Sequence, residues 1–317
     1  MDERIETRAA YGEALLELGK RRPDVVVLDA DLYKSTRTVL FAQAFPERFF
    51  DLGIAEQDMV STAAGLAASG LIPYCNSFAM FITARCYDQI RIQIAYPALP
   101  VKLVGSSAGL TQGPDGASHQ SLEDISLMRG LPNMAVVVPA DDIETRQATA
   151  AIADWPGPVY LRLGRYPTPR LFSPEYRFRM GEMVRLREGN DVVLFATGHL
   201  VAKALEAAEL LARDHIEARV VNVSTIKPLD PEAVRAQAAG VSRAFTIEEH
   251  SILGGLGSAI AEILAEEGGL PLQRLGVRDQ FGESGLADEL LEKHGLQARG
   301  IYTSVLNALR RRLPLTG

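Results

Sequence analysis

The chain has 317 residues, of which 47% are hydrophobic, and its formal net charge at pH 7 is −7. This length exceeds the size at which a single core usually stops growing, so two domains are expected. The acidic balance argues against a nucleic-acid surface, and no apolar run approaches a membrane span. From the charged first residues we expect no signal peptide. Cys75 and Cys86 fall in apolar segments without metal-ligand spacing, which is typical of reduced core cysteines. We therefore expect a cytoplasmic protein with no nucleic-acid or membrane partner.

In the first half of the chain, short Val-, Leu- and Ile-rich runs alternate with longer periodic runs rich in Ala and Leu. The short runs predict strands at Val25–Leu28, Leu71–Cys75, Val101–Gly105, Ala135–Val138 and Val159–Leu163. The longer runs predict helices at Arg8–Arg21, Ile54–Ser69, Phe81–Tyr96, Leu122–Arg129 and Ile143–Asp154. This alternation is typical of a parallel sheet covered by helices on both faces.

The periodicity fails between Tyr166 and Asn190, where three prolines stand among charged residues, and this predicts a domain boundary. Beyond it the alternation resumes. Strands are predicted at Val192–Ala196, Ala218–Asn222, Ala244–Ile247 and Leu272–Gly276, and helices at Val201–Arg213, Leu256–Glu267 and Tyr302–Leu313. The predicted fold class is α/β, with two doubly wound domains that each hold a mostly parallel sheet flanked by helices. Their predicted bounds are residues 1–170 and 190–317, with a linker at 171–189.

Glu56 heads a predicted helix that is otherwise rich in Ala, Gly, Ser, Leu and Val. A helix of such small, apolar residues is expected to be buried. Burial of an unpaired carboxylate costs on the order of several kcal/mol unless it is hydrogen-bonded or protonated. One interpretation is structural, because an acid in the first turn interacts favourably with the helix dipole. The other is that Glu56 has a dedicated partner or marks a functional site.

Two further motifs follow Glu56 within 65 residues: the segment Asn76–Thr83, which contains Phe78 and Phe81, and the Gly-rich loop Gly109–Gln120. Together with the acid, they resemble the pyrimidine-binding half of thiamine-diphosphate enzymes, most closely the C-terminal half of transketolase. The similarity covers nearly the whole chain. It continues through the segments Pro132–Met134, Val138–Asp141, Leu161–Arg165 and Thr246–Gly257. The order and spacing of several motifs make this resemblance specific.

The resemblance implies that thiamine diphosphate is the cofactor and that Glu56 acts on it. In the family, the aligned acid hydrogen-bonds a ring nitrogen of the aminopyrimidine and favours its imino tautomer, whose nitrogen removes the proton from the thiazolium carbon. This is general acid catalysis delivered to a cofactor. Phe78 and Phe81 match the aromatics that sandwich the aminopyrimidine, and in a helical turn they would share a face. At this spacing such a pair is more often ordinary core. A third aromatic, frequent in the family, has no clear equivalent, because Ala84 or Tyr87 occupies that region.

The glycines and Pro114 in the loop allow sharp turns, which leave Asp115 and His119 projecting from one short segment. The resemblance implies that both contact substrate hydroxyls and stabilise the oxygen on which charge develops. Taken alone, an Asp and a His in a loop are usually solvated or turn-forming residues. The flanking sequence favours the functional interpretation.

Arg8, Ser35 and Arg165 align with residues that bind the substrate phosphate in transketolases, with Arg162 as a nearby alternative. Arg suits a phosphate because its planar group forms paired, charge-assisted hydrogen bonds. The departure from the family pattern is Ser107, which stands where typical transketolases have a further phosphate-binding His. The loss of that cation weakens the case for an ordinary pentulose-phosphate donor.

The second half of the chain carries less candidate chemistry. Its Gly254–Gly257 run lacks the Lys-Ser/Thr of a P-loop and the six-residue dinucleotide fingerprint, so we expect it to permit close packing of a helix on the sheet. Glu249 and His250 follow a predicted strand. A hydrogen-bonded pair at the domain junction is at least as plausible for them as a functional role.

Thiamine enzymes hold the diphosphate through a metal ion bound by a Gly-Asp-Gly sequence and a later Asn, and this chain contains no Gly-Asp-Gly. The resemblance therefore implies that this chain holds none of the metal ligands and that a partner, an N-terminal transketolase subunit with that motif, binds magnesium or calcium. An α2β2 heterotetramer is the simplest assembly.

The resulting hypothesis is the C-terminal subunit of a split transketolase, which transfers a two-carbon ketol unit from a ketose or ketose phosphate to an aldose. The alternative is the beta subunit of a 2-oxo acid dehydrogenase, which shares the fold and the Glu but not the Asp115/His119 loop. A third interpretation is a non-catalytic scaffold. The presence of Glu56, Phe78 and His119 together argues against it.

Overall fold

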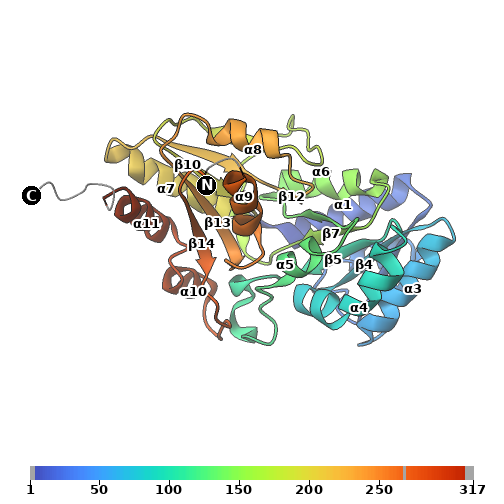
Figure 1. Cartoon of the computed structure of the whole chain (residues 1–317). Helices are drawn as coiled ribbons and strands as arrows, with labels where there is room; N and C mark the ends of the chain where they lie inside the picture. The colour runs from blue at the N-terminus through green and yellow to red at the C-terminus, as the bar shows by residue number, and fades with distance from the viewer. Residues whose placement is uncertain (1–3, 267–268, 311–317) are drawn as a thin grey trace, which may run out of the picture.

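The computed structural model describes residues 4–266 and 269–310, which form two α/β layered units around separate sheets (Figure 1). The first sheet has seven strands in the order β12 (Thr225–Lys227), β6 (Ala135–Val137), β7 (Val159–Arg162), β5 (Lys102–Ser106), β4 (Ile72–Phe78), β2 (Val25–Asp29) and β3 (Phe49–Asp51). All neighbouring strands are parallel except β12, which is antiparallel to β6. Because β12 belongs to the second half of the chain, the two halves share this sheet.

Both faces of the first sheet are buried, as β2 illustrates. Val25 and Val27 belong to the same apolar cluster as residues of α1 (Thr7–Arg21) and α6 (Asp142–Ala151). The alternate residues Val26 and Leu28 pack in a second cluster with α3 (Glu56–Ala68). Successive side chains of a strand point to opposite faces, so a continuous apolar run suits a strand between two helical layers. Figure 1 shows α1 and α6 on one face of the sheet, and α3 and α4 (Tyr87–Gln89) on the other.

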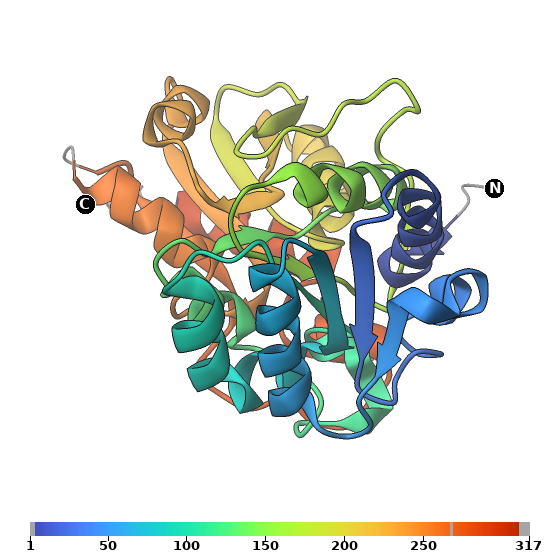
Figure 2. The same ribbon diagram turned by 90° about the vertical axis from the view of Figure 1, so that its right-hand side faces the viewer.

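The segment predicted as one helix from Phe81 to Tyr96 is divided. It consists of a π-helix η2 (Phe81–Arg85), the short α4 and a second π-helix η3 (Ile90–Ala95). It runs beside α3 (Figure 2). Phe78 is the last residue of β4 and Phe81 opens η2, so the two residues do not share a helical turn and their rings meet where the strand passes into the helix. Strand β4 continues beyond its predicted end at Cys75, because Asn76, Ser77 and Phe78 pair with β5.

The second sheet has five strands in the order β14 (Leu272–Val277), β13 (Arg243–Ser251), β10 (Val192–Ala196), β11 (Ala218–Asn222) and β9 (Val184–Arg187). Only β9 is antiparallel to its neighbour. The accompanying helices are α7 (Leu200–Arg213), α8 (Pro231–Ala238), α9 (Leu256–Ala265), α10 (Ala287–Lys293) and α11 (Ala298–Arg310). The predicted fold class, two mostly parallel sheets flanked by helices, is confirmed.

The remaining elements are short. They are β1 (Arg4–Glu6), α2 (Val39–Ala44), η1 (Pro46–Arg48), η4 (Leu110–Asp115), α5 (Asp124–Arg129), η5 (Ile152–Asp154) and β8 (Pro167–Pro169), which pairs antiparallel with β1. The sequence did not predict α2, β3, β12, α8 or α10. The segment between Tyr166 and Asn190, where periodicity fails, carries β8 and β9. The last helix begins at Ala298, four residues before the predicted start; Glu267 and residues 311–313 of predicted helices lie outside the described residues.

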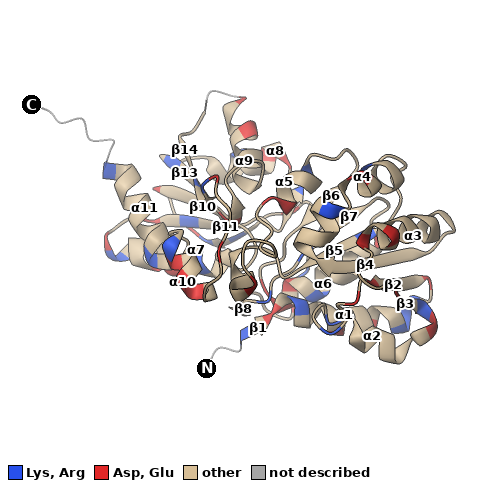
Figure 3. Ribbon diagram, turned by 90° about the horizontal axis from the view of Figure 1, so that it is seen from below, with Lys and Arg blue, Asp and Glu red and all other residues tan. Residues whose placement is uncertain are grey.

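Acidic and basic residues are interspersed over both units in the view of Figure 3. Among residues 4–266 and 269–310, no helix combines the length and the apolar character needed to cross a membrane.

A buried ion pair lies where the two units meet. Arg162 Nε donates to Asp124 Oδ2 at 2.7 Å, and the side chains are 7% and 0% exposed. Tyr160 donates its hydroxyl to the same oxygen, and Arg162 also donates to the backbone carbonyl of Glu249 in β13. Burial is the largest influence on Asp124 and would raise its pKa, but the charge of Arg162, the nearby His250 and the hydrogen bonds from Arg162 and Tyr160 together hold that pKa below its usual value. The pair therefore satisfies its charges internally while it connects the two units.

We expect Asp124→Asn to destabilise the chain by about 3–5 kcal/mol, because it leaves the buried Arg162 guanidinium without a compensating charge. Glu17→Gln makes the same chemical change in the exposed pair with Lys20, and should cost less than about 1 kcal/mol. Urea unfolding of both variants measures the difference. Equal, small losses would show that the junction does not depend on this pair.

Candidate functional site

The sequence motifs gather at the edge of the first sheet where its parallel strands end. Phe78 ends β4, the loop from Gly109 to Gln120 follows β5, and Glu56 begins α3 shortly after β3. In open α/β sheets, ligands bind outside the carboxyl ends of the strands. The fold thus brings residues that are distant in sequence to the edge where a ligand is expected.

Glu56 is buried, with 2% of its surface exposed, and it has a dedicated partner. Arg85 Nη1 donates to its Oε2 at 2.7 Å, while the Arg85 guanidinium lies 4.4 Å from the centre of the Phe81 ring. The sequence left open whether Glu56 has a dedicated partner, and it did not identify Arg85. The available signal was spacing, because Arg85 lies four residues after Phe81 in a helical segment.

Phe78, Phe81 and His119 form an aromatic cluster beside this ion pair. The phenylalanine rings are stacked, with centroids 6.0 Å apart and an interplanar angle of 30°. The His119 ring lies edge-on to both, 5.1 Å from Phe81 and 6.1 Å from Phe78. A buried carboxyl group, which accepts a hydrogen bond when ionised and donates one when protonated, lies next to aromatic faces, and this combination suits a flat heterocycle with ring nitrogens. The residues present therefore fit the aminopyrimidine of thiamine diphosphate.

Asp115 is exposed and interacts with two neighbours. Gln112 Nε2 donates to its Oδ2 at 2.5 Å, and Arg165 Nη1 lies 3.3 Å from the same oxygen. The structure thus joins two residues that the sequence analysis had assigned to different tasks. An anion that binds Arg165 must share it with Asp115 or displace it.

Arg8 and Ser35 are in contact, but not as a side-chain pair. Arg8 Nη1 donates to the backbone carbonyl of Ser35 at 3.1 Å, and its Nε donates to Glu6 at 2.8 Å. The Arg8 backbone N–H donates to the carbonyl of Gly164, which precedes Arg165. The three residues expected to bind phosphate therefore belong to neighbouring segments, although Arg8 is already partly neutralised by Glu6.

Two residues considered for the substrate phosphate do not reach solvent. Arg162 is occupied by the buried pair with Asp124. Ser107 is fully buried and adopts a φ of 55°, and within the described chain its hydroxyl has no hydrogen-bond partner. A larger side chain at Ser107 would have to displace its neighbours, so this position is not an open part of a substrate site.

The Gly254–Gly257 run permits close packing, as expected. A Cβ on Gly255 would lie 2.0 Å from Glu248 Oε2, whose carboxylate accepts the backbone N–H groups of Leu256 and Gly257. His250 is fully buried beside Asp124 and Glu248, and burial lowers its pKa to about 4. His250 therefore lies at the junction, but it does not pair with Glu249 as expected: the Glu249 carboxylate accepts the Thr111 N–H, and the His250 ring contacts the backbone of Ser126 and Ser251.

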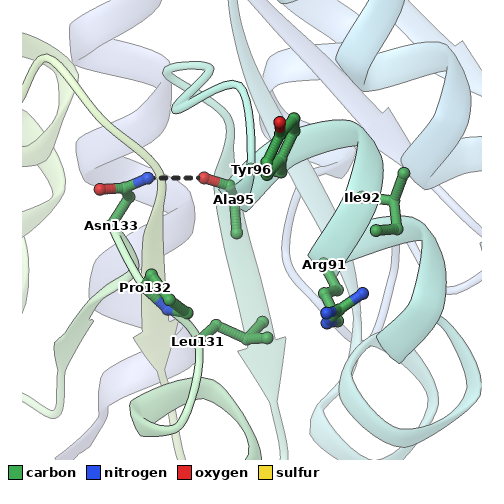
Figure 4. Close-up of a pocket in the computed structure, with 7 residues that line it drawn as sticks. All are labelled: Arg91, Ile92, Ala95, Tyr96, Leu131, Pro132 and Asn133. Carbon is green, nitrogen blue, oxygen red and sulfur yellow. Dashed lines mark hydrogen bonds between the residues drawn. The ribbon is translucent and has the colours of Figure 1, made fainter.

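Two cavities differ in their relation to these residues. One of about 370 Å³ borders the candidate site and is lined from both units; its lining includes Met80, Ala117, Gln120, Ser251, Asp279 and Phe281. The other, of about 290 Å³, lies between η3 and the segment 131–133 (Figure 4). Asn133 Nδ2 donates to the Ala95 carbonyl across it. Because Asn133 precedes β6, this second cavity lies at the opposite edge of the sheet, and no carboxylate lines it.

Comparisons with known proteins agree with the geometry. Residues 3–169 match the pyrimidine binding domain of transketolase, and residues 181–301 match the transketolase C-terminal domain. The chain is 45% identical over 307 residues to a putative transketolase C-terminal section of Methanocaldococcus jannaschii, with 96% of each chain covered. It is also 45% identical over 305 residues to the 6-deoxy-6-sulfo-D-fructose transketolase subunit SqwH of Clostridium sp., covering 96% of this chain and 95% of that one. A solved structure described as a split gene transketolase, inactive beta4 tetramer, has a TM-score of 0.90 and 51% identity, covering 96% of this chain and 99% of that one.

The chain therefore belongs to the transketolase family, whose members are thiamine-diphosphate-dependent transferases. Within that family it corresponds to the C-terminal subunit of a split transketolase. These relatives are named as transketolases and not as 2-oxo acid dehydrogenases, so the first of the three sequence hypotheses is confirmed.

We expect Arg85→Ala to destabilise the isolated chain by roughly 1–3 kcal/mol, because it leaves the Glu56 carboxylate buried without a donor. Arg91→Ala is the matched control, since Arg91 is exposed on the following π-helix and should change stability by less than about 0.5 kcal/mol. Thermal and urea unfolding of the two variants tests this. A loss no larger than that of Arg91→Ala would show that Glu56 does not depend on Arg85.

Proposed function

We propose that this chain supplies the pyrimidine-binding half of a transketolase site and transfers a two-carbon ketol unit from a ketose to an aldose once a partner subunit completes that site. The observation that carries the proposal is the buried Glu56 carboxylate beside Phe78, Phe81 and His119 at the ligand-binding edge of the sheet. The family match shows the class of enzyme; the roles of these residues are our proposal.

Thiamine diphosphate, when bound, supplies a carbon nucleophile that accepts the ketol unit. In our proposal, Glu56 hydrogen-bonds a ring nitrogen of the aminopyrimidine and shares a proton with it, while Phe78 and Phe81 hold that ring by its faces. His119 and Asp115 hydrogen-bond the substrate oxygens, on which charge develops during transfer. The aromatic cluster keeps water away from the carboxylate and so strengthens these hydrogen bonds.

We further propose that an N-terminal transketolase subunit with a Gly-Asp-Gly motif binds the diphosphate through magnesium or calcium, most simply in an α2β2 heterotetramer. Within residues 4–266 and 269–310, no group of three or more His, Cys, Asp and Glu residues is arranged to hold a metal ion. The proposed domain bounds are 1–170 and 190–317, with 171–189 between them. The free, buried Cys75 and Cys86 suit the reducing cytoplasm, where we place the protein.

For the substrate, we propose a sugar with an anionic end group, bound by Arg165 together with Arg8 and Ser35. Arg165 is 37% exposed and lies beside Asp115, so a bound anion could contact it next to the reacting end of the site. One relative is named for a sulfonated sugar, and a sulfonate, like a phosphate, offers three oxygens to a guanidinium. Ser107 is buried and stands where typical transketolases have a cationic His, which is compatible with a donor sugar other than a pentulose phosphate.

The isolated chain is expected to bind thiamine diphosphate weakly and to catalyse no transfer, because the metal and diphosphate account for much of the affinity. Addition of the cognate partner should restore both binding and activity. Calorimetric titration of the cofactor with magnesium, with and without the partner, measures this. Tight, magnesium-dependent binding by this chain alone would contradict the two-subunit proposal.

Glu56→Gln should leave folding and assembly intact but slow proton exchange at the cofactor's thiazolium carbon by about 10²–10⁴-fold, because an amide of similar shape supplies no proton. Glu47→Gln, at a side chain that is 69% exposed, is the matched control and should exchange at the wild-type rate. Both rates are measured on the assembled complex, which is exchanged into deuterium oxide, quenched after set times and analysed by NMR. Wild-type exchange in Glu56→Gln would remove Glu56 from its proposed role.

Arg165→Ala should lower kcat/KM for phosphorylated or sulfonated sugars by an amount equivalent to about 1.5–3 kcal/mol, the scale of hydrogen bonds to charged groups. The value of kcat/KM for unmodified sugars should change much less. Arg179→Ala is the control, since Arg179 is 71% exposed and pairs with Glu182 in the proposed linker. Steady-state kinetics with matched sugar pairs provides the comparison. An equal loss for charged and uncharged sugars would exclude Arg165 as the anion-binding residue.

A further inference from the structure

The loop from Gly109 to Gln120, which carries Asp115 and His119, is attached to the C-terminal domain near both of its ends. We propose that this domain takes part in the transfer reaction by fixing the loop, with Glu249 and Gln120 as positioning residues. This inference rests on the proposed function, because it assumes that Asp115 and His119 contact the substrate.

The first attachment is a carboxylate from β13. Glu249 Oε1 accepts the backbone N–H of Thr111 at 2.5 Å, and its Oε2 lies 3.4 Å from His199 Nδ1. Gly109 has a φ of 82°, and a Cβ there would lie 2.4 Å from the carboxyl carbon of Glu249. The missing side chain therefore lets the carboxylate approach the backbone at the start of the loop. Glu249 is 3% exposed, so water does not compete for this hydrogen bond.

The second attachment is the Gln120 side chain at the end of the loop. Its amide nitrogen lies within hydrogen-bond distance of three carbonyl oxygens: Leu110 at 3.2 Å, Gly113 at 3.1 Å and Glu283 at 2.8 Å. The first two belong to the loop and the third to the C-terminal domain. Gln120 is 3% exposed, and a Cβ on Gly282 would lie 1.8 Å from its Oε1. One buried amide thus connects the turns of the loop to the neighbouring domain.

A third contact supports the middle of the loop. A Cβ on Gly116 would lie 2.6 Å from Ser284 Oγ, and one on Gly113 would lie 3.3 Å from the Gly285 carbonyl. The segment Gly282–Gly285 therefore packs directly against the backbone on either side of Asp115. Asp115 itself is exposed and His119 is half-buried, so both side chains remain accessible to a substrate.

These contacts restrict the loop before any substrate binds. Holding catalytic groups in the productive geometry can be worth orders of magnitude in rate, and supporting residues supply that order. The cofactor contacts proposed for Glu56, Phe78 and Phe81 come from other elements, α3, β4 and η2. Loss of an attachment should therefore affect use of the substrate and leave cofactor binding unchanged.

The test uses the assembled two-subunit complex. Gln120→Leu and Glu249→Leu should each lower kcat/KM by roughly 10–100-fold, the scale expected when catalytic groups are misplaced. Thiamine diphosphate affinity and assembly should match the wild type. Glu249→Gln keeps an oxygen that accepts the Thr111 N–H and should restore most of the activity. Gln147→Leu is the matched control, because Gln147 also bonds the backbone with its amide but contacts Tyr176 and Phe178 instead of the loop.

A double-mutant cycle separates positioning from general loss of stability. If Gln120 acts through His119, then Gln120→Leu should add little to the loss caused by His119→Ala, whereas independent effects add. Additive losses, or kcat/KM within threefold of the wild type in an assembled variant, would overturn the proposal.

Amide hydrogen exchange of the unmodified chain tests the attachment of the loop and requires neither an activity assay nor a substituted variant. The Thr111 amide and segment 109–120 should exchange as slowly as β13. Exchange as fast as that of exposed turns would also overturn the proposal. An inactive wild-type complex with a protected loop would instead count against the proposed function alone.

Discussion

The buried ion pair between Asp124 and Arg162 is the interaction on which the arrangement of the site depends. Arg162 ends a central strand of the first sheet, and its second hydrogen bond reaches the backbone of Glu249 in the second sheet. Within a low-dielectric junction, removal of either charge would leave the other buried and uncompensated. The hydrogen bond from Arg162 to the Glu249 carbonyl holds β13 against the first domain. It thereby places the Glu249 carboxylate at the start of the loop that carries Asp115 and His119.

The same physical requirement governs Glu56. A carboxylate that is 2% exposed needs a donor, and in this chain Arg85 provides it from η2 while its guanidinium covers Phe81. The Glu56 carboxylate is therefore compensated by a residue of this chain. Arg85 binds Oε2, so a cofactor nitrogen can bind the other carboxylate oxygen or displace the arginine.

The sequence predicted what depends on local patterns, and it missed what depends on contacts between distant segments. The continuous apolar run of Val25–Leu28 was sufficient to predict a strand buried on both faces, and the motif order was sufficient to predict the family. By contrast, β12 has three residues and exists because it pairs with β6, some ninety positions earlier in the chain. The periodicity of Phe81–Tyr96 does not distinguish α- from π-helix, because both place apolar residues on one face. The partner of Glu56 and the attachment of Thr111 to Glu249 are tertiary contacts that no local pattern reveals.

The central claim is that Glu56 is the carboxylate that acts on the cofactor. A structure of this chain with its partner subunit, magnesium and thiamine diphosphate tests it directly through the distance between a Glu56 carboxylate oxygen and the nearest aminopyrimidine ring nitrogen. We predict a separation of about 2.6–3.2 Å, the range of a functional hydrogen bond. A Glu56 carboxylate that remains bound only to Arg85, with the cofactor ring beyond hydrogen-bond reach, would contradict the claim.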